Sequence, residues 1–271
     1  MNVDNLYDPQ FVPGEDEMRA YADFIAVVRQ LRRDCPWDRE QTHESVKHLL
    51  IEEAYETVSA IDEENWDDLK KELGDLFLHV VFHSVIAEQD GRFTLVDVIR
   101  KETEKLVRRH PHVFGDVDVA DVEEVLRNWE QIKLNEGEKR SALEGVPRHL
   151  PALLRAYRIQ QKAAGVGFDF PESDGAWDKV EEEIREFRDL LASGAPTEDQ
   201  EREFGDLLFA LVNFARFAGI NPENALSHTN DKFARRFQHI EKRLGEAGTK
   251  MVDVDLATMD DFWNEAKDLG M

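Results

Sequence analysis

Ten acidic side chains fall into two copies of one pattern: Glu-Glu-x-x-Glu, followed about sixteen residues later by Glu-x-Gly-Asp. The first copy comprises Glu52, Glu53, Glu56, Glu72 and Asp75, and the second comprises Glu182, Glu183, Glu186, Glu203 and Asp206. Residues i and i+3 of a helix share one face, so each copy presents two pairs of carboxylates. Two such helices packed antiparallel would bring four carboxylates together, where they repel one another unless a cation lies between them. The pattern predicts a divalent metal site in each copy.

The simplest alternative is an ordinary solvated helix face, because acidic residues at helical spacing are common on surfaces. Two observations argue against it. Asp75 and Asp206 each lie inside an apolar run, where burying a lone ionised carboxylate is costly. The same unfavourable arrangement then recurs in the second half of the chain. We therefore favour the metal site.

The ligand types indicate which metal. Carboxylate oxygens without His or Cys suit Mg²⁺, with Mn²⁺ as a possible substitute, better than zinc or copper. Mg²⁺ keeps several waters and commonly bridges to phosphates, so a phosphate compound is the expected ligand. The chain has no Gly-x4-Gly-Lys-Ser/Thr motif, so we expect metal and side chains to hold the phosphates.

The elements that must position these residues are helices. Apolar residues recur at i, i+3, i+4 and i+7, and no alternating strand pair or Asn-Gly hairpin signal is found. The fold class predicted is therefore all-α. The predicted helices span residues 17–33, 43–63, 66–89, 94–109, 121–134, 150–163, 174–192, 197–219, 222–245 and 256–268.

The two halves match in order, which indicates a tandem duplication. Besides the carboxylates, Lys105-x3-Arg109 corresponds to Lys232-x3-Arg236, and Trp129-x3-Lys133 corresponds to Trp263-x3-Lys267. A polar stretch broken by Gly and Pro separates the halves. The predicted organisation is an N-terminal tail (1–19), a first helical domain (20–134), a linker (135–149) and a second helical domain (150–271).

Composition restricts the partners. Among 271 residues, 58 are acidic and 34 are Lys or Arg, for a net charge of −24. This charge argues against general binding to nucleic acid or to anionic membranes. A single cysteine, Cys35, excludes an intrachain disulfide and a Cys-based zinc site. With no secretion signal and no spanning apolar stretch recognised, we expect a soluble cytoplasmic protein.

Further motifs accompany the carboxylates and carry a resemblance to a known family. They are Cys35-Pro36-Trp37-Asp38, residues 108–114 (Arg-Arg-His-Pro-His-Val-Phe), residues 129–133 (Trp-Glu-Gln-Ile-Lys), Gly167-Phe168-Asp169 and residues 232–237 (Lys-Phe-Ala-Arg-Arg-Phe). Together with the two acidic patterns, from about Arg32 to Lys267, they resemble the MazG family of nucleoside triphosphate pyrophosphohydrolases. These are all-α enzymes that share an ancestry with dimeric dUTP pyrophosphatases, and the match is to their tandem-domain members.

The resemblance implies hydrolysis of an NTP or dNTP to the monophosphate and pyrophosphate, with clearance of unwanted nucleotides as the purpose. In the second copy it implies that Glu183, Glu186, Glu203 and Asp206 bind Mg²⁺ and that Glu182 orients or deprotonates the attacking water. It further implies that Lys232 and Arg236 hold phosphate oxygens and that Trp263, Lys267, Lys179 and Arg202 contact nucleotide. The counterparts in the first copy are Glu52 as the water-orienting residue, Glu53, Glu56, Glu72 and Asp75 as metal ligands, and Lys105, Arg109, Trp129 and Lys133 as substrate contacts.

The resemblance also implies a homodimer, because related enzymes assemble their bundles from two chains. Both acidic quartets are intact, so the metal argument does not choose between the copies; by analogy we expect the second to be active. Two other functions stay open from the residues. A ferritin-like di-metal bundle would need Glu-x-x-His, whereas the partners here are Glu and Asp. A non-enzymatic helical interaction module would not need the Lys/Arg pairs.

Overall fold

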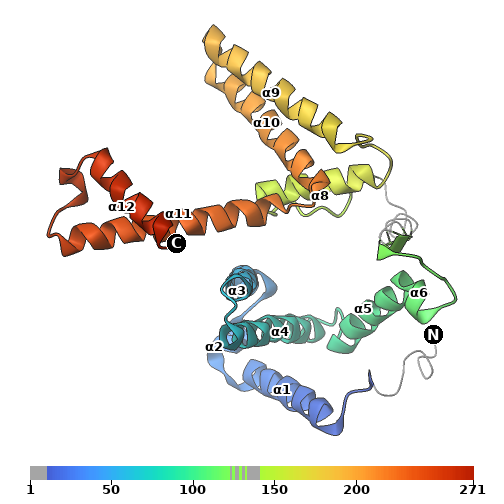
Figure 1. Cartoon of the computed structure of the whole chain (residues 1–271). Helices are drawn as coiled ribbons and strands as arrows, with labels where there is room; N and C mark the ends of the chain where they lie inside the picture. The colour runs from blue at the N-terminus through green and yellow to red at the C-terminus, as the bar shows by residue number, and fades with distance from the viewer. Residues whose placement is uncertain (1–10, 123, 126–127, 130–131, 133–140) are drawn as a thin grey trace. The chain divides into compact units, whose positions relative to one another are not determined.

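The computed structural model describes residues 11–122, 124–125, 128–129, 132 and 141–271. Within these residues the regular elements are helices and no strand occurs, which confirms the all-α prediction. The chain divides into two compact units, Met1–Trp129 and Glu130–Met271 (Figure 1). The division falls near the predicted linker.

Unit 1 contains six described helices. They are α1 (Glu15–Asp34), α2 (Pro36–Glu40), α3 (His43–Asp62), α4 (Trp66–Gln89), α5 (Leu95–Arg109) and α6 (Pro111–Phe114). Four of the predicted helices lie within one or two residues of their predicted limits, and the predicted helix at 121–134 includes residues outside the described part of the chain. The first begins at Glu15, inside the stretch expected to be a tail. Helices α2 and α6 were not predicted; each is about one turn long and begins at a proline.

Helix α4 is the centre of unit 1 and packs against α1, α3 and α5. Its buried residues Val81, Phe82, Val85 and Ile86 form a core with Val28 of α1, Val46 of α3 and Leu95 of α5. Burying apolar side chains of this size contributes about 1.5–3 kcal/mol each. This core fixes α3 beside α4, which is the pairing that the first acidic copy requires.

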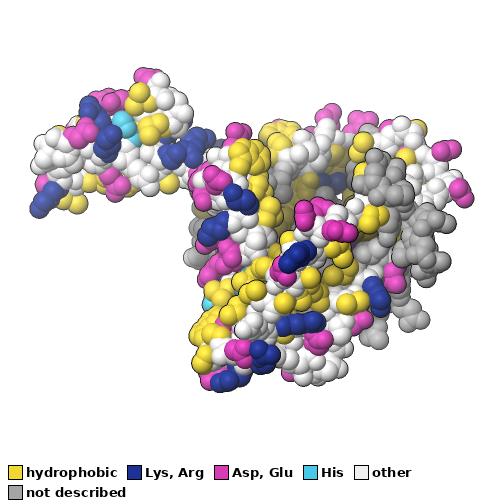
Figure 2. All heavy atoms as spheres, turned by 90° about the horizontal axis from the view of Figure 1, so that it is seen from below, with side chains coloured by type: hydrophobic (Ala, Val, Ile, Leu, Met, Phe, Trp, Pro, Cys, Tyr) yellow, Lys and Arg dark blue, Asp and Glu magenta, His cyan; other side chains and the backbone are white. Residues whose placement is uncertain are grey.

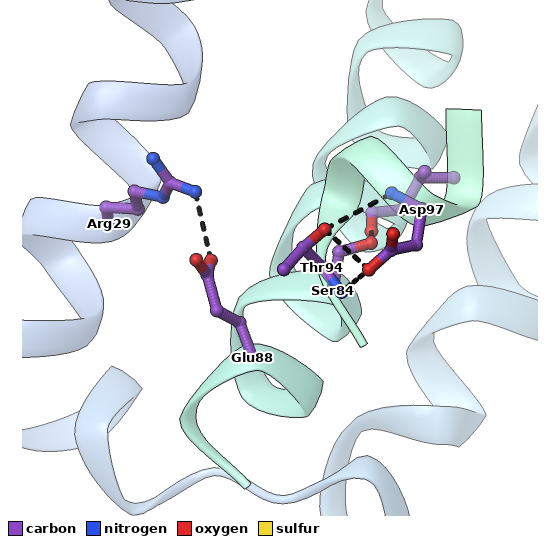
Figure 3. Close-up of polar contacts among 6 residues, drawn as sticks. Arg29, Ser84, Glu88, Thr94 and Asp97 are labelled. Atoms are coloured by element: carbon purple, nitrogen blue, oxygen red, sulfur yellow. Dashed lines mark hydrogen bonds and ion pairs between the residues drawn. The ribbon is translucent and has the colours of Figure 1, made fainter. Parts of the chain in front are cut away.

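Polar contacts stabilise the C-terminal end of α4 and the start of α5 (Figure 3). Arg29 of α1 donates to the Glu88 carboxylate of α4 at 2.9 Å. At the start of α5, the Thr94 hydroxyl oxygen accepts from the Asp97 N–H, and the Asp97 carboxylate accepts from the Thr94 N–H. The hydrogen bonds that the Thr94 N–H and hydroxyl donate to the Asp97 carboxylate hold the pKa of Asp97 below its usual value. The reciprocal pair is a capping box, which ends the turn after α4 and starts α5.

Unit 2 contains α8 (Ala152–Ala164), α9 (Ser173–Ser193), α10 (Thr197–Phe217), α11 (Pro222–Glu246), a 3₁₀ turn (Met251–Asp253) and α12 (Leu256–Asp268). Helices α9 and α10 form a long hairpin, whose turn uses Gly194 at φ 66°. Asn221 caps α11 through its side-chain oxygen, as the Asn-Pro sequence predicts. Helix α8 packs on α10, and α11 packs on α12 and α8.

Apolar side chains remain at the surface of both units (Figure 2). On α10, Phe204, Leu208 and Leu211 recur at i, i+4 and i+7 and are 47%, 38% and 40% exposed. On α4, Leu73 and Val80 are exposed at corresponding positions of the first copy. Apolar stripes of this kind indicate surfaces that another chain can cover. None of the described helices is long and apolar enough to cross a membrane.

Candidate active site

The second acidic copy converges where α9 lies against α10. Carboxylate oxygens of Glu182, Glu183 and Glu186 all lie within 4.8 Å of one another. Across the hairpin, Glu203 of α10 contacts Glu186 and Glu183. Burial, reinforced by these contacts and by repulsion from both carboxylates, raises the pKa of Glu203. Its Oε1 atom is buried without a hydrogen-bond partner. The fourth predicted ligand, Asp206, lies one turn further along α10.

Lys179 forms ion pairs with this cluster. Its Nζ atom lies 2.8 Å from Glu182 and 2.6 Å from Glu183. Hydrogen bonds to Glu182 and Glu183 raise the pKa of Lys179, and the bond from Lys179 lowers the pKa of Glu182. Glu182 is therefore held ionised, as an acceptor of a water proton must be.

The first acidic copy repeats this geometry between α3 and α4. Carboxylate oxygens of Glu53, Glu56 and Glu72 lie within 4.8 Å of one another. Burial, followed by repulsion from Asp75, Glu56 and Glu72, raises the pKa of Glu53. Glu72 is 5% exposed, with one oxygen 2.8 Å from Lys71 and the other buried without a partner. The hydrogen bond from Lys71 lowers the pKa of Glu72. Glu52 lies beside this cluster on an exposed position of α3.

Both clusters fit a hard divalent cation. All of the atoms that they offer as metal ligands are carboxylate oxygens, which hard cations prefer. Each cluster contains one buried oxygen without a hydrogen-bond partner, on Glu72 and on Glu203. Each also contains a carboxyl whose pKa is raised by burial and by its neighbours, on Glu53 and on Glu203. A bound cation would remove both unfavourable features.

A cavity of about 630 Å³ adjoins the second cluster and lies wholly within unit 2. Glu183, Asp206 and Lys179 line one part of it. The remaining lining comes from Leu143, from α8 and α10, and from the loop before α9, including Gln160, Phe168, Phe209 and Asn213. Asp169 of that loop pairs with Arg216 of α10, so the loop is tied to the helix that carries Asp206. The volume is in the range of small-molecule sites.

Sequence patterns did not identify most of these cavity residues as site residues. Phe168 and Asp169 belong to the motif Gly167-Phe168-Asp169, which contributes to the family resemblance and was the sequence signal for this loop. Gln160 and Asn213 carry no such signal, because each reads as one more polar position on a helix.

The predicted phosphate-binding residues of the second copy lie on α11 and α12. The Arg236 guanidinium lies over the Trp263 ring, 5.4 Å from its centroid, and Arg236 Nε donates to the carbonyl of Met271. Lys267 donates to Asn264 at 3.2 Å, and Lys232 is exposed. Figure 1 shows α11 and α12 extending away from the α9–α10 hairpin. The structure brings these residues near one another, but within one chain it does not bring them to the carboxylates.

The other predicted substrate contacts are dispersed. Lys105 and Arg109 lie one turn apart on α5, and Lys105 pairs with Glu102. The Trp129 ring meets the His110 ring edge-on at 4.9 Å. Arg202 pairs with Asp199 at 3.0 Å on an exposed face of α10. Lys133 lies outside the described residues.

Comparison with known proteins identifies the family. The family model described as "MazG nucleotide pyrophosphohydrolase domain" matches residues 41–114. The chain is 44% identical over 251 residues to the Thermotoga maritima nucleoside triphosphate pyrophosphohydrolase/pyrophosphatase MazG, covering 91% of this chain and 95% of that protein. It is 43% identical over 256 residues to the Escherichia coli K12 nucleoside triphosphate pyrophosphohydrolase, covering 90% and 96%. The chain belongs to the MazG family. The predicted family and hydrolase class are therefore confirmed, and the ferritin-like and non-enzymatic alternatives lose their support.

A third relative is longer than this chain. The chain is 47% identical over 271 residues to Bacillus subtilis YabN, covering 98% of this chain but 55% of YabN. The chain thus spans about half of YabN and nearly the whole of the two pyrophosphohydrolases.

Proposed function

We propose that this MazG protein hydrolyses nucleoside and deoxynucleoside triphosphates to the monophosphate and pyrophosphate, with Mg²⁺ as the cofactor and Mn²⁺ as a substitute. The observation that carries the proposal is the convergence of Glu183, Glu186 and Glu203 beside a cavity that Asp206 lines. This arrangement offers an ion site and a space for an organic group next to each other. The names of the T. maritima and E. coli relatives give the same reaction class.

Each residue of the cluster has a role in the proposed reaction. Glu183, Glu186, Glu203 and Asp206 would hold Mg²⁺, which supplies charge neutralisation to the triphosphate when bound. Glu182, kept ionised by Lys179, accepts a hydrogen bond from the water that attacks the α-phosphorus. A P–O bond to water forms, the bond to the pyrophosphate group breaks, and the water proton passes through Glu182 to solvent. Positioning and electrostatics account for most catalysis of phosphate transfer.

We propose that the second copy is the active one. Counting from the shared Glu-x-Gly-Asp motif, Ala210 and Asn213 of α10 correspond to His79 and Phe82 of α4. Ala210 and Asn213 line the cavity. His79 and Phe82 are larger than the residue each replaces, and they are 8% and 7% exposed. In the first copy, large buried side chains therefore occupy the positions that line the cavity in the second copy.

We further propose that the active unit is a homodimer. In it, Lys232 and Arg236 of one chain complete the second carboxylate cluster of the partner chain. The separation of α11–α12 from the α9–α10 hairpin within one chain supports this arrangement. The exposed stripe Phe204, Leu208 and Leu211 offers an apolar surface for a second chain. Two-fold pairing would bury the stripe on both chains at once.

Product identification tests the reaction. Each NTP and dNTP is incubated with the protein and Mg²⁺, and products are separated by anion-exchange chromatography. We expect monophosphate and pyrophosphate in equal amounts. Release of single phosphates, or no turnover of any nucleotide, would refute the proposal.

Matched substitutions test which copy works. We expect Glu183→Gln to reduce kcat by at least about 100-fold, because the variant removes a metal ligand in the active copy. Glu53→Gln makes the same change at the matching position of the first copy and should leave kcat within about two-fold, since no step passes through it. The opposite pattern would assign the activity to the first copy.

A further inference from the structure

Gln160 of α8 presents an acceptor to the cavity beside the second cluster. The residue is 6% exposed, and its Nε2 group donates to the carbonyl of Phe209 at 2.8 Å. This bond fixes the orientation of the amide, because the nitrogen must face the carbonyl. The other atom, Oε1, is buried and has no hydrogen-bond partner. A buried acceptor without a partner is unfavourable because it has lost its hydrogen bonds to water, so it indicates a site for a donor that binds there.

The rest of the cavity suits a flat heterocycle. Phe168, Phe170 and Phe209 contribute aromatic surface, and Phe168 is 82% exposed at the edge of the site. Asn213 uses its Oδ1 atom to accept from Arg216, which leaves its amide nitrogen as a donor. The cavity therefore combines aromatic surface with one buried acceptor and one amide donor. Nucleobases have aromatic faces and an edge on which N–H donors and acceptors adjoin.

We propose that this cavity receives the nucleobase and that Gln160 Oε1 accepts a hydrogen bond from an N–H on its edge. The inference rests on the proposed function, because the triphosphate must lie on the carboxylates for the base to reach the cavity. Glu183, Asp206 and Lys179 line the same cavity and thus connect the two parts. Each common base carries an N–H donor on its pairing edge, so Gln160 binds a base without choosing one. The site binds bases as a class and gives weak discrimination among them.

Gln160→Leu tests the role of the acceptor. We expect KM for base-bearing triphosphates to rise about 2- to 12-fold with kcat unchanged, which corresponds to one neutral hydrogen bond. KM for a triphosphate without a base, deoxyribose 5′-triphosphate, should not change. The substitution removes the hydrogen bond to Phe209 as well as the partnerless oxygen, so the ratio of the two KM values, and not the melting temperature, reports the role of Oε1. A purely structural role would leave that ratio as it was.

Gln161→Leu is the matched control, since Gln161 neighbours Gln160 on α8 and hydrogen-bonds to Arg158 instead of lining the cavity. It should leave both KM values unchanged. Calorimetric titration with adenosine monophosphate and with ribose 5-phosphate separates this inference from the proposed reaction, because it needs no turnover. The wild type should bind the adenosine compound more tightly, and Gln160→Leu should reduce that preference. Equal affinities for the two compounds in the wild type, or equal losses in the variant, would overturn the inference.

Discussion

At the scale of single residues, folding brings the carboxylates of each cluster so close together that they repel one another. The pKa of Glu203 is raised by burial and by contact with Glu186 and Glu183. The folded state therefore binds a proton on Glu203 more tightly than the unfolded state does. Stability from this group is present below its ordinary pKa of 4.5 and is lost as the pH rises through the raised folded value. A divalent cation would offset this loss at neutral pH.

This sign gives a stability prediction for Glu203→Gln. The substitution removes one of the repelling charges, so the metal-free variant should melt at a higher temperature than the wild type at pH 7.5. The difference should shrink at pH 4, where Glu203 is protonated. Saturating Mg²⁺, at about a hundred times its dissociation constant, should stabilise the wild type by about 2.7 kcal/mol per site, and the variant by less.

Glu201→Gln is the control for this experiment, because Glu201 lies two positions away on an exposed part of α10. Melting curves at both pH values, with and without Mg²⁺, measure all three proteins. A metal-free Glu203→Gln variant that melts below the wild type would show that the cluster is stabilising without a cation.

At the scale of helices, local sequence signals predicted the elements well. Thr42, Asn65 and Thr94 cap α3, α4 and α5, and the predicted starts lie at or next to these caps. Helices α2 and α6 were missed because they are too short to produce a periodic apolar pattern. The acidic clusters were predicted because residues at i and i+3 of a helix lie on the same face, so their spacing in the sequence determines that they are close in space. The cavity was not, because its wall forms only when α8 and α10 pack together.

The capping box of α5 offers a prediction at this scale. Thr94→Ala removes the acceptor for the Asp97 N–H and should destabilise unit 1 by about 1 kcal/mol. Urea denaturation followed by circular dichroism measures the change in the free energy of unfolding. Thr103→Ala on the same helix is the control, since the Thr103 hydroxyl donates only to the carbonyl of Ile99 within the helix. Equal losses in the two variants would show that the cap has no particular role.

At the scale of the whole molecule, the sequence predicted two matching halves, and the family resemblance implied a homodimer. It did not reveal that α11 and α12 of the second unit would lie apart from the α9–α10 carboxylates. Correspondence between repeats preserves the order of motifs along the chain. It does not determine whether the motifs of one repeat meet within one chain or across two. That outcome depends on the angle at which α11 leaves α10, which no local pattern encodes.

Mixing two inactive variants tests whether the site is shared. Glu183→Gln lacks a metal ligand, and Arg236→Ala lacks a phosphate-binding cation. If each site takes carboxylates from one chain and cations from its partner, mixed dimers contain one intact site. Random exchange of subunits should then restore about a quarter of the wild-type rate. A mixture that stays as inactive as its components would place both groups within one chain, and a double variant mixed with wild type serves as the control.

The outward reach of α11 and α12 has a consequence for how the protein would work in dilute solution. If the phosphate-binding Lys and Arg side chains come from the partner chain, each site is active only while the dimer stays associated. Turnover per chain would then fall when the protein is scarce and recover when it is abundant. The rate measured in an assay would depend on how long the enzyme had stood at its final dilution before substrate was added.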